Sequence, residues 1–64
     1  MSEVIVYTTN ACGYCTRVKM LLSAREIAYR EINVAGDADA FVDLARRSGM
    51  MTLPQVFVGE TLVG

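Results

Sequence analysis

The 64-residue sequence predicts an α/β domain with the element order βαβαββ and a four-stranded mixed sheet. Three observations lead to this prediction. A run of apolar, mostly β-branched residues near the start precedes a segment whose apolar positions have helical spacing. A second helical segment, with caps at both ends, follows a weaker strand. The sequence then closes on two short strand-like runs separated by Gly59-Glu60, which is typical of a hairpin.

The first strand and helix occupy the first third of the sequence. Residues 4–7 are apolar at consecutive positions, as in a central strand that is covered on both faces. Thr8, Thr9 and Asn10 then favour a turn or a helix cap. From Gly13 onward we expect a helix with one buried face, formed by Cys15, Val18, Leu21 and Leu22.

The second half of the sequence predicts one more helix and three more strands. Residues 27–34 alternate imperfectly, which predicts an edge-like strand parallel to the first. Asp37 suits the start of a helix and Gly49 a left-handed stop, and the inward positions between them are Phe41, Leu44, Ala45 and Ser48. Residues 55–58 and 61–63 predict an antiparallel hairpin.

The end of the sequence predicts an uncovered surface. No further element is predicted after the last strand. We expect the two helices to pack on one face of the sheet, which leaves the other face less covered. We therefore expect a single domain over residues 1–64 that lacks a terminal helix. Such a chain hides its exposed apolar face by self-association or remains poorly stable.

Charge and hydropathy restrict the partners and the compartment. The formal net charge is −1, and no polybasic stretch is present, so nucleic acid and anionic membranes are poor partners. The longest apolar run near the start is far too short for a signal peptide or a membrane span. We expect a cytoplasmic protein, in a compartment that keeps thiols reduced.

The only two cysteines, Cys12 and Cys15, form a C-x-x-C motif where the first helix is predicted to begin. One turn apart on the same face, they can close a strained disulfide. The unpaired N–H groups at the helix start favour a thiolate at Cys12, whereas burial would keep Cys15 protonated. We assign Cys12 as the nucleophile and Cys15 as the resolving thiol that attacks a mixed disulfide at Cys12.

Two other roles for the cysteine pair are weaker. A structural zinc site takes four nitrogen or sulfur ligands, and this sequence has no histidine and no third cysteine. Two inert core cysteines are the other alternative, since free cysteine is commonly buried. The position of the pair between a strand and a helix favours a redox motif over both.

Several motifs together resemble the glutaredoxins, which have the thioredoxin fold. These are Cys12-Gly13-Tyr14-Cys15, the TLPQVFVG segment at residues 52–59 and the closing Leu62-Val63-Gly64, so the resemblance covers the whole chain. Thioredoxin itself is less similar, because Ala11 stands where it has a tryptophan. The resemblance implies disulfide exchange with glutathione as co-substrate. Cys12 would attack glutathionylated or disulfide-containing proteins, and glutathione or Cys15 would resolve the mixed disulfide.

The resemblance also implies a glutathione site. Pro54 would follow a cis bond, and the free backbone N–H and C=O of Leu53 would pair with the cysteine of glutathione like one rung of a sheet. Thr52 joins this site. Tyr14, beside the nucleophile, would stack on the substrate or hydrogen-bond to it, or would simply cover the thiol.

Parts of the usual glutathione site are missing from this sequence. Thr9 stands where many glutaredoxins have a lysine, and Met50-Met51 stand where relatives often have a basic residue. Arg46 or Arg47 are the candidates to replace those anchors, although both also suit the end of a helix. The family usually continues into a helix whose start binds a glutathione carboxylate, so we expect weaker glutathione affinity here.

Two alternatives to the glutathione-dependent enzyme stay open. Relatives with a small residue at the position of Gly13 bridge a [2Fe–2S] cluster between two subunits through the first cysteine, here Cys12, and glutathione. Glycine gives a looser turn beside the sulfur than proline does. The missing basic anchors leave the second alternative, a glutaredoxin-like electron donor that thioredoxin reductase reduces.

Overall fold

The predicted order of elements is confirmed. The computed structural model describes residues 3–10 and 12–63. Its elements are β1 (Val4–Thr8), α1 (Gly13–Ala24), β2 (Arg30–Asn33), α2 (Ala38–Ser48), β3 (Gln55–Val58) and β4 (Thr61–Leu62). The strands form one mixed sheet in the order β2-β1-β3-β4, with β2 parallel to β1 and with β3 antiparallel to both β1 and β4.

β1 lies in the interior of the sheet and carries the chain toward the cysteines. It pairs with β2 through Tyr7 and Ile32, and with β3 through Ile5 and Phe57. Alternate residues of a strand point to opposite faces, and β1 is apolar on both. Val6, on the face opposite Tyr7, is fully buried. The prediction of a central strand covered on both sides is therefore confirmed.

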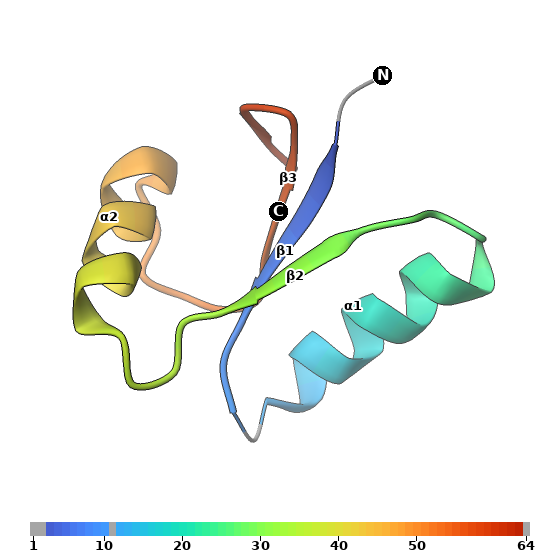
Figure 1. Ribbon diagram of the computed structural model, residues 1–64, viewed down its shortest axis with the longest axis horizontal. Helices are drawn as coiled ribbons and strands as arrows, with labels where there is room; N and C mark the ends of the chain where they lie inside the picture. Colours follow the sequence, from blue (N-terminus) through green and yellow to red (C-terminus); the bar gives the residue numbers. More distant parts are fainter. Residues whose placement is uncertain (1–2, 11, 64) are drawn as a thin grey trace.

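The expectation that both helices pack on one face of the sheet is wrong. α1 and α2 lie on opposite sides of the strands (Figure 1). Leu44 of α2 packs with Tyr7 and Phe57 on one face of the sheet. Lys19 of α1 contacts Glu31, which lies on the opposite face of β2. The reason is the apolar character of β1 on both faces, because each face needs its own helix to exclude water.

The main core lies between the sheet and α2. Its buried residues are Tyr7, Val34, Leu44 and Phe57. The Tyr7 and Phe57 rings meet edge to face, with centroids 5.6 Å apart and planes at 81°. Arg47 closes this core, since its guanidinium lies 5.4 Å from the Tyr7 ring centroid and donates to the Tyr7 hydroxyl at 2.9 Å.

The caps of α2 are those expected from the sequence. The Asp37 carboxylate accepts a hydrogen bond from the Ala40 N–H at 3.0 Å, which satisfies one of the free amides of the first turn. Gly49 ends the helix with φ at 75°, in the left-handed region, and its N–H bonds to the Ala45 carbonyl. α2 therefore begins and ends through local hydrogen bonds.

α1 differs from its prediction in one residue of the buried face. Cys15 is buried and Leu22 half-buried, but Leu21 is 52% exposed. At 3.6 residues per turn, Leu21 lies about 120° around the helix from Cys15, at the margin of the packed face. The second strand is also shorter than residues 27–34, because the Ile27 N–H still bonds to the Leu22 carbonyl at 2.9 Å in the turn after α1.

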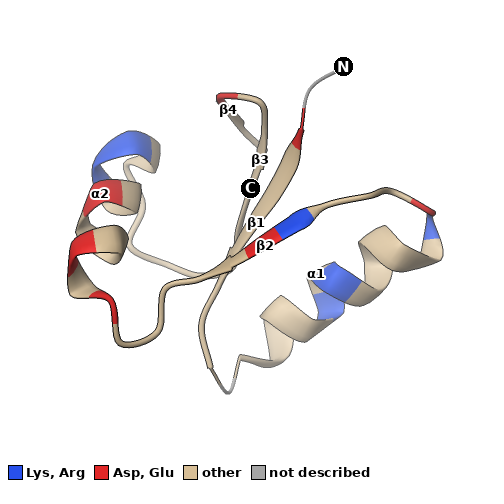
Figure 2. Cartoon of the chain, in the orientation of Figure 1, with Lys and Arg blue, Asp and Glu red and all other residues tan. Residues whose placement is uncertain are grey.

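Several large apolar side chains remain exposed. They are Tyr14, Met20, Leu21, Ile27, Val42, Met51, Val58 and Val63. Self-association through such side chains stays a prediction. Neither of the helices in the described part of the chain is long and apolar enough to cross a membrane. Basic residues are dispersed over both helices and β2 (Figure 2), so the described residues present no polybasic face.

Candidate active site at the start of α1

Cys12 is the N-cap of α1. Its backbone is extended, with φ −109° and ψ 107°, and its sulfur accepts a hydrogen bond from the Cys15 N–H at 3.3 Å. The Thr16 N–H bonds to the Cys12 carbonyl at 3.3 Å, which closes the first turn. The sulfur therefore lies against the free N–H groups at the positive end of the helix, where a negative charge is stabilised.

The two thiols are free and have opposite tendencies to ionise. The Cys15 thiol, then the Cys15 N–H, and less strongly the Tyr14 N–H, hold the pKa of Cys12 below the ordinary range of a thiol. Burial raises the pKa of Cys15, which is 2% exposed, and the neighbouring Cys12 raises it further. This asymmetry is the one expected for a nucleophile and a waiting second thiol, and it supports those assigned roles.

The structure brings the cysteines to the segment before β3. The Leu53–Pro54 peptide bond is cis, as the resemblance implied. The Cys12 sulfur lies 4.0 Å from the Leu53 carbonyl oxygen, although 41 positions separate the two residues in sequence. Leu53 and Pro54 are half-buried and Thr52 is exposed. Their proposed contact with glutathione stays a prediction.

Gln55 is a residue of this site that the sequence analysis assigned only to a strand. It is fully buried, and its side-chain amide donates to the Met50 carbonyl at 3.1 Å and to the Thr52 carbonyl at 2.9 Å. Gln55 thereby holds the loop that carries Leu53. Its Oε1 is buried with no hydrogen-bond partner among the described residues. The signal available in the sequence was a polar residue two positions before Phe57, on the same inward face of the strand, because a buried polar side chain needs hydrogen-bond partners.

Tyr14 stands beside Cys12 and is 68% exposed. Its ring is covered on one side by Arg17, whose guanidinium lies 5.4 Å from the ring centroid. The exposed ring leaves a surface for a substrate next to the thiol. Of the two arginines considered as replacement anchors, Arg47 is held by Tyr7 and by Asp43 at 3.3 Å. Arg46 instead lines a separate hollow of about 360 Å³ on α2.

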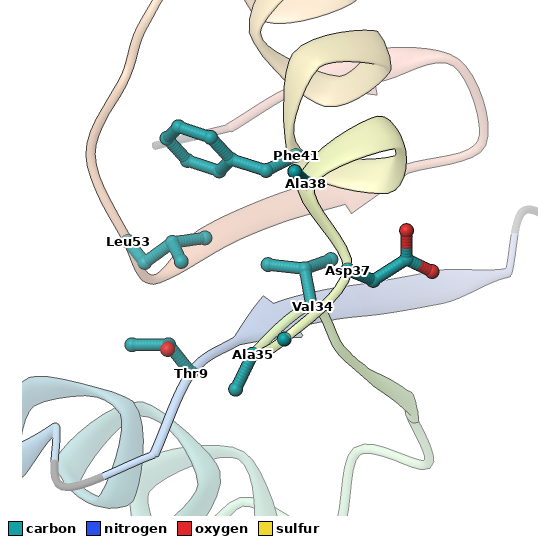
Figure 3. A pocket seen from close by; sticks show the side chains of 8 residues that line it. Thr9, Val34, Ala35, Asp37, Ala38, Phe41 and Leu53 are labelled. Carbon is teal, nitrogen blue, oxygen red and sulfur yellow. The ribbon is translucent and has the colours of Figure 1, made fainter.

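Two hollows flank Cys12 and Leu53. One, of about 500 Å³, lies beside Leu53, with Val34 and Phe41 directed toward the same space (Figure 3). The other, of about 430 Å³, is lined by both cysteines and by polar side chains of α1 and β2. Thr9 lines both hollows. The described residues contain no group of three or more His, Cys, Asp or Glu side chains that could hold a metal ion.

The chain is similar in sequence to known glutaredoxins. The glutaredoxin family model matches residues 4–63. The glutaredoxin of Pseudomonas aeruginosa is 42% identical over 64 residues, which are 100% of this chain and 76% of that protein. Glutaredoxin 3 of Escherichia coli K12 is 36% identical over 64 residues, with 100% and 77% covered.

Solved structures agree with the sequence relatives. A crystal structure of a buckwheat glutaredoxin–glutathione complex superposes with a TM-score of 0.86 at 33% identity, covering 98% of this chain and 60% of that one. A solution structure of glutaredoxin from Brucella melitensis gives a TM-score of 0.84 at 38% identity, covering 100% and 70%. The fold is therefore thioredoxin-like. The chain belongs to the glutaredoxin family of thiol–disulfide oxidoreductases.

Proposed function

We propose that this protein is a glutathione-dependent thiol–disulfide oxidoreductase that reduces protein disulfides and glutathione mixed disulfides. The observation that carries the proposal is the position of Cys12. Its sulfur caps α1, receives the Cys15 N–H at 3.3 Å and lies 4.0 Å from the backbone of Leu53. A stabilised thiolate beside the backbone of the loop before β3 suits attack on a disulfide held in an extended segment.

The first step is attack of the Cys12 thiolate on one sulfur of a substrate disulfide. The bond between Cys12 and that sulfur forms, the substrate disulfide breaks, and the departing thiolate takes a proton from water. The helix start favours this step because it stabilises the attacking thiolate without burying it. Cys12 is half-buried, so the substrate can reach it.

Two routes complete the cycle. A glutathione thiolate attacks the sulfur that was transferred to Cys12, which yields a glutathione-containing disulfide and restores the Cys12 thiol. Alternatively, Cys15 attacks the Cys12 sulfur, forming the Cys12–Cys15 disulfide and releasing the substrate as a thiol. Two glutathione molecules then reduce that disulfide and leave as glutathione disulfide. In both routes two electrons pass from thiols to the substrate.

The proposed glutathione site consists of Tyr14, Thr52, Leu53 and Pro54. The cysteine of glutathione would lie along Leu53, whose backbone faces Cys12, and Tyr14 would contact the tripeptide with its exposed ring. The hollow beside Leu53 leaves room for further groups of the substrate (Figure 3). A related glutaredoxin of the same fold was solved as a glutathione complex, which supports this assignment. The proposal includes a cytoplasmic location, since glutathione works in a reducing compartment.

The iron–sulfur alternative is not favoured. That assembly would take the Cys12 thiolate from each of two chains and its other ligands from glutathione, and the described residues hold no group of three or more His, Cys, Asp or Glu side chains that would supply ligands within one chain. No observation on the described residues therefore favours the cluster over disulfide exchange. The described residues also give no specific support for reduction by thioredoxin reductase.

The test is turnover with separate reducing systems. The protein is assayed on a glutathionylated peptide and on a protein disulfide, with glutathione and glutathione reductase or with thioredoxin reductase alone. We expect turnover with glutathione. The Cys15→Ser variant should keep activity on the glutathionylated peptide and lose most activity on the protein disulfide. Turnover with thioredoxin reductase and none with glutathione would contradict the proposal.

A second test measures the ionisation of Cys12 directly. The rate of iodoacetamide alkylation is followed against pH, and the modified cysteine is identified by mass spectrometry. Because the pKa of Cys12 is lowered, alkylation of this residue should begin at a lower pH than alkylation of a free thiol. A Cys12 that titrates at or above about 8.5 would count against its role as nucleophile.

A further inference from the structure

The resolving route requires that Cys15 ionise, yet Cys15 is almost completely buried. The charged and polar groups that face it come from three elements. The ionisable ones are Cys12 at the N-cap of α1, Lys19 of α1 and Glu31 of β2, which share one hollow with Cys15, and the uncharged ones are Asn10, Thr16, Asn33 and the Thr9 backbone N–H. Lys19 is the only cation among these groups, so it is the natural candidate to stabilise a thiolate at this position.

Lys19 is held on the side of α1 that carries Cys15. The two residues are four apart, so their Cβ atoms lie about 5–6 Å apart on one helix face. The Lys19 ammonium donates to the two Glu31 carboxylate oxygens at 3.1 and 3.3 Å. The side chains of Lys19 and Glu31 are only 32% and 34% exposed.

Glu31 is itself fixed to the centre of the sheet. The Thr8 hydroxyl donates to its carboxylate at 2.7 Å, and Thr8 is 1% exposed. The chain of contacts therefore runs from β1 through β2 to α1 and ends at Lys19. Figure 2 shows adjacent acidic and basic positions on β2 and basic positions on α1. A lysine tethered in this way loses little further freedom when a negative charge forms nearby.

One hollow joins this ion pair to the reactive sulfurs. The hollow of about 430 Å³ is lined by Cys12, Cys15, Lys19 and Glu31 together. Cys15 is part of this polar lining, so water held in the hollow would give the departing proton a path to solvent. The site thus combines an approach for water with a fixed cation one helical turn from the second sulfur.

We infer that Lys19, held by Glu31 and Thr8, is a positioning residue that stabilises the Cys15 thiolate during the resolving step. This inference rests on the proposed function. An opposite charge within about 4–6 Å favours the ionised form of a thiol. The charge of Lys19 is among the influences that lower the pKa of Cys15 against the larger effect of burial.

The chemical step balances without any further reactant. Cys15 gives its proton to water in the hollow and attacks the Cys12 sulfur of the mixed disulfide. The Cys12–Cys15 bond forms, the bond from Cys12 to the substrate sulfur breaks, and the released substrate thiolate takes a proton from water. Lys19 forms no bond in this step and acts only through its charge.

The test separates attack by Cys12 from attack by Cys15 in one reaction. Excess reduced protein is mixed with Ellman's reagent, which releases one coloured thiolate when Cys12 attacks and a second when Cys15 resolves the mixed disulfide. Both phases are followed by stopped flow from about pH 5 to about pH 10.5, a range that extends above the ordinary thiol value of about 8.5 because burial raises the pKa of Cys15. The variants are Lys19→Gln, which keeps a hydrogen-bond donor, Lys19→Arg, which keeps the charge, and the matched control Arg25→Gln.

We expect Lys19→Gln to slow the second phase about tenfold at pH 7 and to move its midpoint to higher pH, with the first phase unchanged. Lys19→Arg should restore the second phase, and Arg25→Gln should behave as the unaltered protein. An unchanged second phase in Lys19→Gln, or an equal loss in both phases, would overturn the inference. If Lys19→Gln does not fold, a slow second phase in Lys19→Arg overturns it equally.

The proposed function fails by a different result. Absence of glutathione-coupled turnover in the unaltered protein would contradict the glutathione-dependent enzyme, whatever the two Ellman phases show. Normal turnover together with a Lys19-independent second phase would contradict the role of Lys19 alone.

Discussion

The two helices of this protein begin with the same hydrogen bond, made by different atoms. At α2 the Asp37 carboxylate accepts the Ala40 N–H at 3.0 Å, and at α1 the Cys12 sulfur accepts the Cys15 N–H at 3.3 Å. The carboxylate does not attack disulfides. The sulfur becomes ionised because of the helix start and then can attack a disulfide. A common capping bond thus stabilises structure at one helix and favours the thiolate form of the proposed nucleophile at the other.

The helices also differ in what they bury. α2 places Leu44, with no exposed surface, in the main core, and its last turn supplies Arg47 to close that core. The only fully buried side chain of α1 is Cys15, while Met20 and Leu21 are 66% and 52% exposed. The difference indicates that α2 contributes more to stability and α1 more to chemistry, and the following experiments test that division.

Replacing the sulfur cap should have the largest effect. Cys12→Ser keeps an oxygen that can cap α1, because serine is a preferred N-cap, but removes the nucleophile. We expect glutathione-coupled activity to fall by more than about a hundredfold, with the circular dichroism spectrum unchanged. Substantial activity in this variant would show that Cys12 is not the attacking group.

Shortening the buried residue of α2 should have the largest effect on stability. Leu44→Ala leaves a cavity in the core and should cost about 2–5 kcal/mol of unfolding free energy. The matched change on α1, Leu21→Ala, should cost less than about 1 kcal/mol because half of that side chain is in water. Urea unfolding of both variants gives the comparison, and equal losses would contradict the proposed division between the helices.

Removing the carboxylate cap should weaken α2 moderately. Asp37→Ala leaves the Ala40 N–H without its partner and should cost about 0.5–2 kcal/mol. Asp37→Ser should recover most of that loss, since the serine hydroxyl can accept the same bond. The measurement is thermal unfolding at one protein concentration, and a loss that serine does not recover would mean that Asp37 does not act as a cap.

A proline at the first position of α1 should stabilise the fold slightly. Gly13→Pro removes freedom from the unfolded chain, proline suits the first helical position, and Cys12 already has the extended backbone that precedes proline. A Cβ at Gly13 would meet no atom within 4 Å. We expect a gain of about 0.4–1 kcal/mol by urea unfolding. A loss of stability would show that α1 needs glycine at its start.

The smallest effect concerns acid stability. Hydrogen bonds from Thr8, then Lys19, hold the pKa of Glu31 below its ordinary value of 4.5. Glu31 therefore stabilises the fold above pH 4.5 and loses that contribution as the pH falls through its lower folded value. Glu31→Gln should give a flatter decline of stability between pH 5 and 3, a window set around that ordinary value, and an unchanged slope would contradict the role of this carboxylate.

Local chemistry made much of this structure predictable from the sequence. The apolar run of β1, the Asp37 cap and the left-handed Gly49 are each specified by a few neighbouring residues, and the structure has all three. The position of the cysteine pair at the start of α1 follows from the same local signals. The family resemblance added the cis bond before Pro54, which local reasoning alone would not favour.

Contacts between distant segments were beyond the sequence pattern. The approach of Cys12 to Leu53 depends on the antiparallel register of β1 and β3, and the tether of Lys19 depends on the parallel register of β1 and β2. The helical periodicity placed Leu21 on the buried face of α1 together with Cys15, but the structure has Leu21 at the margin of that face. These features require the arrangement of the whole sheet.

Gln55 has a consequence for how substrate preference can change in this fold. Its side-chain amide donates hydrogen bonds to two carbonyls of the loop that carries Leu53, and the side chain is fully buried. Exchanging that amide for a carboxylate would set an acceptor against two acceptors and release the loop. Under the proposed function, substrate preference can therefore be changed from beneath the reactive surface, by one buried atom, while the side chains proposed to touch the substrate stay the same.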